Sequence, residues 1–470
     1  MTAFWRLSAA ELLAGYGRRA FSPVEVTREQ LERIERMNGR LGAYLVVDHE
    51  GAMASARIAE AAWMQAGDKP LLCGVPAHVK DTIEMAGFPT TYGSLAFREN
   101  VQPDAEIVVR LRTAGAVILG KTNTPEFALS PRTENRLGPP AVNPWDLLRT
   151  CGGSTGGGAA AVAAGLGPLC IGSDSAGSVR LPAAYQGIFA LKPSFQRIPA
   201  VQRWRASPGR SHNGPITRTV GDTALMMQAL AGPHRDDPDS ARYPAADYLS
   251  IVDGSVNGAR VAVSHTFGRD VALEPDQAQM LERAIATMRD LGCSIVEADP
   301  PMREDSDEIA PGVWAYSGDH YAAAEDLIPN FWAKHADDLT SYARPIYAAG
   351  QSALAWQARQ RVRRDRAYAA RMRAWFEDYD YLLSPCCPAA PIGDAPEVRD
   401  DRKGQFSFLA PFNHAYNPAA SIPIGLNAAG LPLSVQVVGR LGDDVGTLRL
   451  ASRMEAANPW ADRWPSFALT

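Results

Sequence analysis

The chain has 470 residues, of which 46% are hydrophobic, and this is enough for a large buried core. Its net charge of −5 and its pI near 6.0 argue against nucleic acid as the main partner. Six cysteines without a Cys-x-x-Cys pair favour a reduced, cytoplasmic setting. No signal peptide is expected, because a charged N-terminal segment followed by an apolar one is missing. The longest run of low charge, 156–172, is too short to span a bilayer, so no membrane is expected as a partner.

Apolar strands alternate with helices in the first part of the chain. Ser8 and Ser22 each precede a glutamate by three residues, which is the capping box that begins a helix. In chain order, the patterns predict helices over 8–38, 52–66 and 107–116, strands over 71–79 and 117–119, and a loop over 120–126. This alternation predicts an α/β fold with a mostly parallel or mixed central sheet.

The rest of the chain continues the alternation. The stretch 197–215 is rich in Pro, Arg and Gly and is predicted to be irregular. It is followed by a helix over 219–232, a strand over 261–263, a helix over 276–291, a strand over 293–298, a helical region over 305–378, a strand over 381–385, two strands across 421–440 and a helix over 446–457.

Metal and nucleotide sites have no sequence support. The eight histidines are scattered singly, and neither His-Glu-x-x-His nor a Cys/His cluster at ligand spacing occurs. The chain also lacks a phosphate loop with its lysine and a Gly-x-Gly-x-x-Gly after a strand. We therefore expect an activity that needs no cofactor.

Two serines are candidate nucleophiles. Ser154 lies in Gly-Gly-Ser-Thr-Gly, which fits the nucleophile elbow of α/β-hydrolases, but 149–151 is a poor strand to precede such an elbow. Ser178 directly follows the apolar strand 169–171, in Gly-Ser-Asp-Ser-Ala-Gly-Ser-Val-Arg. Two Gly/Ser loops joined by a small-residue helix can bring two hydroxyls and several free N–H groups together, as acyl transfer requires.

Segment 151–193 resembles the signature segment of the amidase signature family of serine hydrolases. That family reads Gly-Gly-Ser-Ser-Gly-Gly, then a small-residue helix, then Gly-Thr-Asp-x-Gly-Gly-Ser-x-Arg-x-Pro-Ala and Gly-Leu-Lys-Pro. The spacing of the two serines also matches, since 178 − 154 = 24. Further segments resemble family landmarks in the same order: 74–81, 120–127, 143–145, 214–218 with Asp222, and 430–432 with Gln436.

The resemblance implies that Lys80, Ser154 and Ser178 form the family's Ser-cisSer-Lys triad. Ser178 would attack the carbonyl carbon, Ser154 would relay protons through its hydroxyl, and Lys80 would act as the base. The resemblance also implies that the peptide bond at Ser154 is cis. A lysine can be a base only when it is neutral, so its pKa of about 10.4 must fall by roughly 3 units, and burial is the expected cause. The glycines around Ser154 would supply backbone freedom for the cis bond.

Backbone N–H groups in the turn before Ser178 would stabilise the oxyanion. Ser175, Ala176 and Gly177 are the expected donors, because a turn between a strand and a helix leaves such groups unpaired. The family usually has Gly at the position of Ala176, so the geometry of the turn there is open. Asp174 and Arg180 are expected to support this loop as a buried ion pair rather than to take part in the chemistry.

Several other side chains have structural interpretations. His78 and His414 are expected to pack or to line a pocket rim rather than to act as bases. An aromatic series is expected mainly in a helical core, with some members in the acyl or leaving-group pocket: Trp314, Tyr316, Tyr321, Phe331 and Trp332. Tyr416 replaces a glycine of the family pattern and would either close part of the pocket or pack outside it.

The resemblance implies one amidase domain over 1–470, with a signature core at about 65–225 and a variable helical pocket region at about 305–378. The fold would be a central mixed β-sheet surrounded by α-helices. The expected activity is hydrolysis of a small carboxamide, ester or carbamate (urethane) through an acyl-enzyme on Ser178. Aromatic content in 197–212 and 305–345 favours an aryl or alkyl substrate over a charged one.

Two alternatives remain at this level. One is the glutaminase component of a tRNA-dependent amidotransferase, which would need partner subunits. The other is a catalytically inactive binding scaffold, against which the retention of both serines and the lysine argues. Whether the chain is a monomer or a homodimer is left open.

Overall fold

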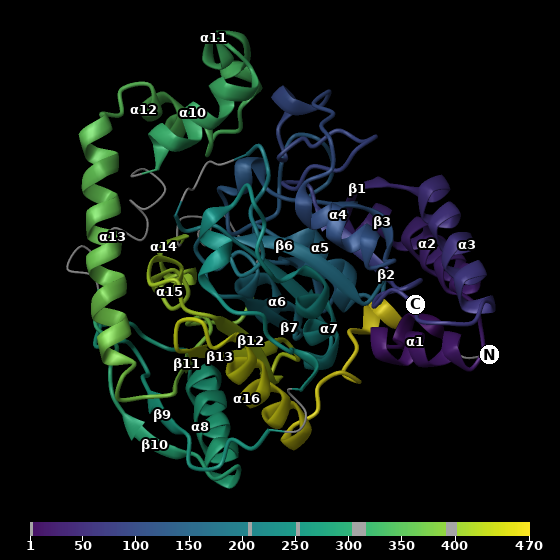
Figure 1. Cartoon of the computed structure of the whole chain (residues 1–470). Coiled ribbons are helices and arrows are strands. Elements are labelled where there is room, and N and C mark those ends of the chain that lie inside the picture. The colour runs from purple at the N-terminus through teal and green to yellow at the C-terminus, as the bar shows by residue number, and fades with distance from the viewer. Residues whose placement is uncertain (1–2, 205–208, 251–253, 303–315, 392–401) are drawn as a thin grey trace.

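A computed structural model describes residues 3–204, 209–250, 254–302, 316–391 and 402–470. A long twisted sheet crosses the molecule and helices lie on both of its faces (Figure 1). The N-terminal helices lie near one end of the sheet and the strands β9 and β10 lie at the other.

Eleven strands of the described residues form one sheet, in the order β1-β3-β2-β6-β8-β7-β12-β13-β11-β9-β10. Strand β2 pairs parallel with β3 and β6, and β9 pairs parallel with β10 and β11, whereas the other neighbours are antiparallel. The predicted central mixed sheet is therefore confirmed. The strands are β1 Tyr44–Val47, β2 Pro76–Lys80, β3 Val117–Thr122, β6 Leu169–Asp174, β7 Phe189–Lys192, β8 His212–Thr217, β9 Arg260–Val263, β10 Ser294–Glu297, β11 Tyr381–Pro385, β12 Ala419–Leu426 and β13 Pro432–Gly439.

The helices follow most of the predicted positions. The capping boxes at Ser8 and Ser22 are both formed, each with its glutamate three residues later. The described α-helices are α1 Ala9–Gly17, α2 Pro23–Leu41, α3 His49–Met64, α4 Glu106–Thr113, α5 Gly156–Ala163, α6 Arg180–Gln186, α7 Val220–Leu230, α8 Pro275–Asp290, α10 Ser317–Leu327, α11 Phe331–His335, α12 Arg344–Gly350, α13 Ala355–Trp375, α14 Arg402–Gln405, α15 Pro411–His414 and α16 Asp444–Ala457.

Strand alternation separates two hydrophobic layers. In β6, Leu169 and Ile171 join the main core, which includes residues of α4, α7, α8 and α16. Cys170, between them, joins a second core with the alanines of α5 and α6. Because successive side chains of a strand point to opposite faces, α5 and α6 cover one face and the larger helices cover the other. In β2, Val79 belongs to the main core, so the next residue, Lys80, points toward α5.

Strand β8 was not predicted. His212–Thr217 lies in the stretch expected to be irregular, yet it pairs with β6 on one side and β7 on the other. The segment lacks apolar alternation and contains Pro215, which removes a ladder donor and normally argues against a central strand. Pairing with these two strands, which precede it in the chain, makes this segment extended.

Other strands differ from the prediction in their boundaries or were not predicted. The predicted strand over 71–79 begins only at Pro76, after a turn, and the strand over 117–119 continues to Thr122 at the expense of the predicted loop. Strand β1 was missed, as was a two-stranded ribbon of β4 Val142–Asn143 and β5 Asp146–Thr150 that directly precedes the Ser154 loop. Strand β1 is apolar but only four residues long, and β4 and β5 are too short or too polar for a strand pattern to be visible.

The region predicted to be helical over 305–378 is divided into α10, α11, α12 and α13 within its described part. In Figure 1 the first three form a lobe beside the sheet, and α13 runs along the edge of the molecule. A separate aromatic cluster joins this lobe to loops of the signature region: Tyr92, Phe97, Phe127, Trp204, Phe331 and Tyr347. Residues 303–315 lie outside the described residues.

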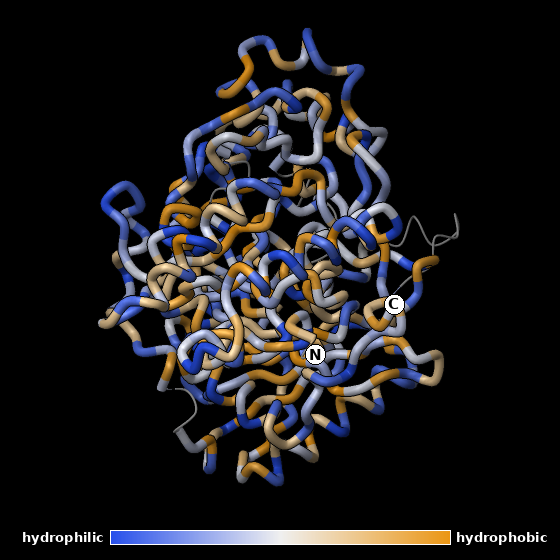
Figure 2. The backbone as a smooth tube through the Cα atoms, turned by 90° about the vertical axis from the view of Figure 1, so that its right-hand side faces the viewer, coloured by the Kyte–Doolittle hydropathy of each residue, from blue (hydrophilic) through white to orange (hydrophobic). Residues whose placement is uncertain are grey.

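Hydrophobic segments run through the middle of the molecule, and many of the outer loops are hydrophilic (Figure 2). Over the described part of the chain, no helix combines the length and the apolar character that crossing a bilayer requires.

Helix α5 packs so closely that Gly157 accepts no side chain. A Cβ atom there would lie 2.5 Å from the Ala43 carbonyl oxygen and 2.6 Å from the Asn123 backbone nitrogen. Because both neighbours are backbone atoms, Gly157→Ala should destabilise the fold by about 3 kcal/mol, at the upper end of overpacking effects. Gly39→Ala is the matched control: it lies in helix α2 with nothing near its Cβ position, and should stabilise by about 0.5–1 kcal/mol.

Denaturant unfolding of both variants measures these changes. Equal midpoints for the Gly157 and Gly39 variants would contradict the packing described for α5.

Candidate active site

Lys80 is a fully buried lysine at the end of β2. Its side chain has no solvent-accessible surface, and Val79 and Ile83 beside it are buried as well. Its Nζ lies 2.7 Å from Ser154 Oγ, 3.1 Å from Ser173 Oγ and 3.4 Å from the Ser173 carbonyl oxygen. The amine is therefore surrounded by hydroxyl and carbonyl oxygens.

Burial lowers the pKa of Lys80 from 10.5 to about 7, although the negative charge of Asp174 acts in the opposite direction. The cause is the one expected from the sequence: a low-dielectric environment disfavours the ammonium form. At neutral pH a large fraction of Lys80 is a neutral amine with a free lone pair. Such an amine can accept a proton from Ser154, with which it is in hydrogen-bond contact.

Ser154 lies in the loop between β5 and α5, and the peptide bond between Gly153 and Ser154 is cis. The Ser154 side chain is completely buried. The carbonyl oxygen of Ser154 accepts a hydrogen bond from Thr124 Oγ1, and Thr155 N–H donates to the Ser178 carbonyl oxygen at 3.0 Å. The second of these bonds fixes the Ser154 loop directly against the turn that carries Ser178.

The glycines of this loop have two different roles. Gly152 has a φ of +82° and lies against the backbone of Pro182, so it needs both glycine's backbone freedom and its small size. Gly156 and Gly157 lie inside α5 with helical backbone. Backbone freedom was the expected reason for all of the glycines in this loop. At Gly156 and Gly157 the reason is instead the close approach of neighbouring groups, which leaves no room for a side chain.

Ser178 lies in the turn between β6 and α6, as predicted, and 7% of its surface is exposed. The N–H of Gly177 donates to Asp174 Oδ1 at 2.6 Å and is thus directed away from the role of oxyanion donor expected for it. Within the described residues, the N–H groups of Ser175, Ala176 and Ser178 have no hydrogen-bond partner. Gly177 instead provides the turn, with a φ of +129°.

A buried ion pair holds this turn. Arg180 and Asp174 are both inaccessible to solvent and form two hydrogen bonds of 3.0 Å each. Burial alone would raise the pKa of Asp174, but the Arg180 charge and its hydrogen bonds hold this pKa below its ordinary value. Arg180 also donates to Asn413 Oδ1 and Gln436 Oε1, both at 2.7 Å. The supporting role expected for the pair is in agreement with this geometry.

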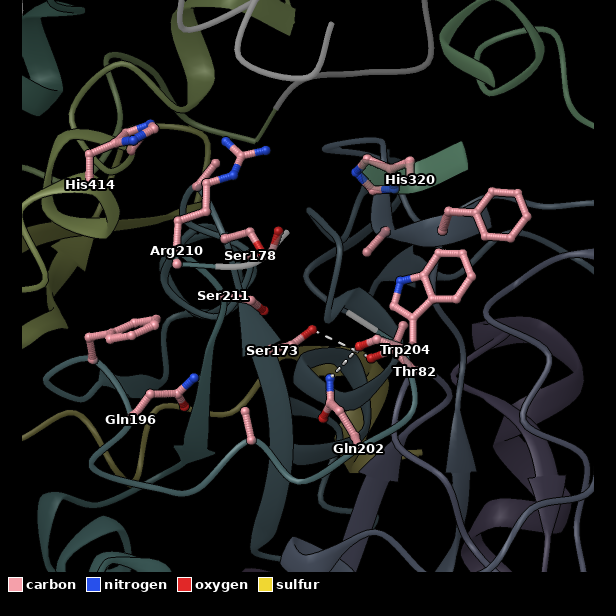
Figure 3. Close-up of a pocket in the computed structure, with 18 of the residues that line it drawn as sticks. Thr82, Ser173, Ser178, Gln196, Gln202, Trp204, Arg210, Ser211, His320 and His414 are labelled. Carbon is pink, nitrogen blue, oxygen red and sulfur yellow. Dashed lines mark hydrogen bonds between the residues drawn. The ribbon is translucent and has the colours of Figure 1, made fainter. Parts of the chain in front are cut away.

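A cavity opens above Ser178 (Figure 3). In this view, Arg210 and His414 lie on one side of it, and Trp204 and His320 on the other. The floor includes Ser173, Ser175, Ala176 and Ser178. Further apolar side chains in the wall are Phe127, Phe195 and Phe406. A largely apolar cavity with a few convergent polar groups is the usual form of a small-molecule site.

Both histidines singled out in the sequence have the expected structural roles. His78 is buried, contacts the Tyr44 hydroxyl at 2.6 Å, and its pKa falls to about 4 because of burial. His414 lines the cavity and lies 3.0 Å from Asp365 Oδ1. Neither contacts Ser154 or Ser178 among the interactions of the described residues.

The aromatic series predicted from the sequence belongs to the core, and none of its described members lines the cavity. Phe331 is buried in the aromatic cluster of the lobe, and Tyr316 is buried beside the cavity under Arg210. Tyr321 and Trp332 pack partly buried against the same cluster, whereas Trp314 lies outside the described residues. Tyr416 has a φ of +70°, and its ring packs against that of Phe195 in a tilted arrangement, with the ring centres 4.9 Å apart. Tyr416 is not among the residues that line the cavity.

Four residues at the site were not singled out from the sequence: Ser173, Trp204, Arg210 and Asn413. Ser173 carries a usable signal, since it is a hydroxyl directly after the predicted strand 169–171 and shortly before Ser178. Asn413 lies three residues before Tyr416, in the same stretch of the family pattern. Trp204 and Arg210 belong to the stretch predicted to be irregular, where no pattern indicates which side chains point inward.

Known proteins resemble this chain over nearly its whole length. A family model described as Amidase matches residues 25–448. An acylamidase of Rhodococcus erythropolis is 35% identical over 98% of this chain and 98% of its own length. One of the subunits of the glutamyl-tRNA(Gln) amidotransferase of Gloeobacter violaceus is 34% identical over 95% of this chain and 96% of its own.

Solved structures of amidase signature enzymes also resemble this chain over nearly its whole length. A bacterial aryl acylamidase of the amidase signature enzymes superposes with a TM-score of 0.89, at 25% identity, over 98% of both chains. A 6-aminohexanoate cyclic dimer hydrolase superposes with a TM-score of 0.87, at 27% identity, over 99% of this chain and all of its own. With the family model spanning most of the sequence, these matches establish that the chain belongs to the amidase family, the amidase signature hydrolases.

Proposed function

We propose that this amidase-family hydrolase cleaves the C–N bond of a small carboxamide through an acyl-enzyme on Ser178. The observation that carries the proposal is the contact of 2.7 Å between the buried Lys80 amine and Ser154 Oγ, on a lysine whose pKa is lowered to about 7. Ser154 is completely buried, and the N–H of the next residue, Thr155, donates to the carbonyl oxygen of Ser178, which reaches the cavity. Ser154 can therefore pass a proton between Lys80 and Ser178.

In the proposed first half-reaction, Ser178 Oγ bonds to the carbonyl carbon of the amide. Its proton moves to Ser154 Oγ as the proton of Ser154 moves to neutral Lys80. The negative charge on the former carbonyl oxygen is stabilised by the N–H groups of Ser175, Ala176 and Ser178, which are unpaired within the described residues. When the C–N bond breaks, Ser154 protonates the leaving amine and Lys80 returns a proton to Ser154.

The second half-reaction uses the same groups with water. A water molecule attacks the acyl ester, and its proton passes through Ser154 to Lys80. Collapse of the intermediate breaks the bond to Ser178 Oγ, which recovers a proton through the same relay. The products are the free amine and a carboxylic acid. Esters and carbamates contain the same electrophilic carbon and are proposed as further substrates.

A second candidate is supported by the amidotransferase relative. Because this chain is 34% identical to the amidotransferase subunit, glutamine should be tested as a substrate beside acylanilides. A glutaminase component of that kind should hydrolyse glutamine and copurify with partner proteins, whereas an acylamidase should hydrolyse p-nitroanilides or aryl esters alone. A hydrolysis screen of the purified protein with these substrates, carbamates and glutamine separates the two.

Labelling of the nucleophile tests the proposal directly. A fluorophosphonate probe should modify Ser178 in the folded protein, and peptide mass mapping should locate it there. Ser178→Ala should lose labelling and at least about 10⁴-fold in kcat, as expected when a nucleophile is removed. Ser154→Ala should retain the fold but lose about 10²–10⁴-fold, the usual contribution of proton transfer.

Ser352→Ala serves as the control, because Ser352 is exposed on the lobe and should label and turn over like the wild type. Absence of labelling in folded wild-type protein would favour a binding scaffold instead.

The pH dependence should reveal the lysine. Burial lowers the pKa of Lys80 to about 7, so the amine is neutral and active above this pH and protonated below it. We expect kcat/KM to fall about tenfold per pH unit on the acid side of pH 7 and to level off above it. The residual activity of Lys80→Ala should lack this acid limb. A wild-type profile that is flat between about pH 5.5 and 8 would argue against Lys80 as the base.

A further inference from the structure

Arg210 is a buried cation in the active-site cavity without an ionic partner among the described residues. It is only 5% exposed, and it lines the same cavity as Ser178. Its Nε is buried without a hydrogen-bond partner, and no hydrogen bond or ion pair joins its guanidinium to any described residue. Arginine keeps its charge at neutral pH, so this cavity holds one positive charge that the described part of the fold does not pair.

A neighbouring arginine shows the contrast. Arg210 and Arg361 both lie over the ring of Tyr316, at 3.5 and 3.9 Å from its centre. Arg361 forms an ion pair with Asp319. The other nearby carboxylate, Asp365, is engaged by the Tyr316 hydroxyl and by His414. The acidic groups beside Arg210 are thus bonded to other side chains.

The free-energy cost of leaving the Arg210 charge unpaired favours the binding of an anionic ligand beside it. A buried charge without a partner costs free energy, and stacking on one aromatic ring compensates only part of that cost. A buried guanidinium without an ionic partner can form two parallel hydrogen bonds with a planar anion that enters the cavity.

The backbone of Arg210 is fixed relative to the nucleophile. Its carbonyl oxygen accepts hydrogen bonds from His212 Nδ1 at 2.7 Å and from Asn413 Nδ2 at 3.4 Å. Asn413 Nδ2 also donates to Asp174 Oδ1, and Asp174 holds the turn of Ser178. One connected set of hydrogen bonds therefore positions both the cation and Ser178.

We propose that Arg210 binds a carboxylate of the substrate, so that the enzyme selects amides that carry a carboxylate on one side of the scissile bond. The apolar part of such a substrate would lie toward Phe127 and Trp204, across the cavity. The proposal rests on the proposed function of Ser178 and differs from the expectation, drawn from the sequence, of an uncharged substrate.

A carboxylate fits better than a phosphate. One guanidinium supplies one positive charge, and Asp319 and Asp365 are near enough to interact with it electrostatically. Three more aspartates line the cavity: Asp236, Asp237 and Asp239. A dianion would be repelled by this surrounding negative charge more strongly than a monoanion.

Matched substrate pairs test the proposal. On the acyl side, glutaranilic acid is compared with 4-nitrobutyranilide, and on the amine side N-acetyl-4-aminobenzoate is compared with 4-nitroacetanilide. A nitro group has the shape of a carboxylate without its charge. Arg210→Gln should lower kcat/KM for the carboxylate member of at least one pair by about 30-fold or more, and for the nitro member by less than about threefold. Comparing each variant with the wild type cancels the intrinsic reactivity of the substrates.

Control variants separate binding from structure. Arg361→Gln should change both members of a pair by the same factor, because Arg361 is paired within the protein. Arg210→Lys should keep part of the preference, since it retains the charge but not the paired donors. The thermal midpoint of Arg210→Gln should be no lower than that of the wild type, because an unpaired buried charge is removed. Equal losses for both members of both pairs, or a midpoint far below that of the wild type, would overturn the proposal.

A binding experiment keeps this test independent of catalysis. Ser178→Ala and the double variant Ser178→Ala/Arg210→Gln are titrated with glutaranilic acid and N-acetyl-4-aminobenzoate by calorimetry. Weaker binding of either ligand to the double variant supports the carboxylate site even if the wild type hydrolyses no amide, which would be the failure of the proposed function. Equal affinities of both proteins for both ligands would overturn the carboxylate site even if amides are hydrolysed.

Discussion

The contact between a buried lysine and a buried serine is the constraint on which this site depends. Lys80 lies at the end of a central strand with no accessible surface, and that burial lowers its pKa to about 7. The same amine in water would be an ammonium ion and could accept no proton. The sheet and α5 thus do more than hold Lys80 in place: by excluding water they make its nitrogen a base. The contact with Ser154 gives that base a partner.

A second buried pair holds the turn that carries Ser178, the proposed nucleophile. Asp174 ends β6 and Arg180 begins α6, so their ion pair spans the turn in which Ser178 lies. Arg180 reaches Asn413 and Gln436, more than 200 residues further along the chain. The C-terminal strands therefore complete a turn that the signature segment begins. Separating Asp174 from Arg180 would leave an uncompensated buried charge. Because this costs free energy, the ion pair holds the turn in place.

The cavity combines two chemical environments. One side is aromatic and belongs to the cluster that joins the lobe of α10–α12 to the signature loops. The other side carries Arg210 and His414 above the C-terminal elements (Figure 3). A substrate that uses both sides would be apolar at one end and anionic at the other. The proposed catalytic groups contact neither of these two sides preferentially, so under the proposed function specificity would be set by elements outside the signature segment.

The sequence by itself determined the family and the central mixed sheet and singled out Lys80, Ser154 and Ser178 as the proposed catalytic residues, because these depend on local patterns: glycines at fixed spacing, a small-residue helix and an apolar strand before a turn. It also predicted that Lys80 is buried, from its apolar neighbours. Only the tertiary structure decided that His212–Thr217 is a central strand, that the N–H of Gly177 is directed to Asp174, and that Arg210 lines the cavity of the nucleophile. Strand β8 is extended because it pairs with β6 and β7, and the Asp174 carboxylate that accepts from Gly177 is held by Arg180 and Asn413. Asn413 also bonds to the Arg210 carbonyl oxygen, and no local pattern of residues predicts these pairings.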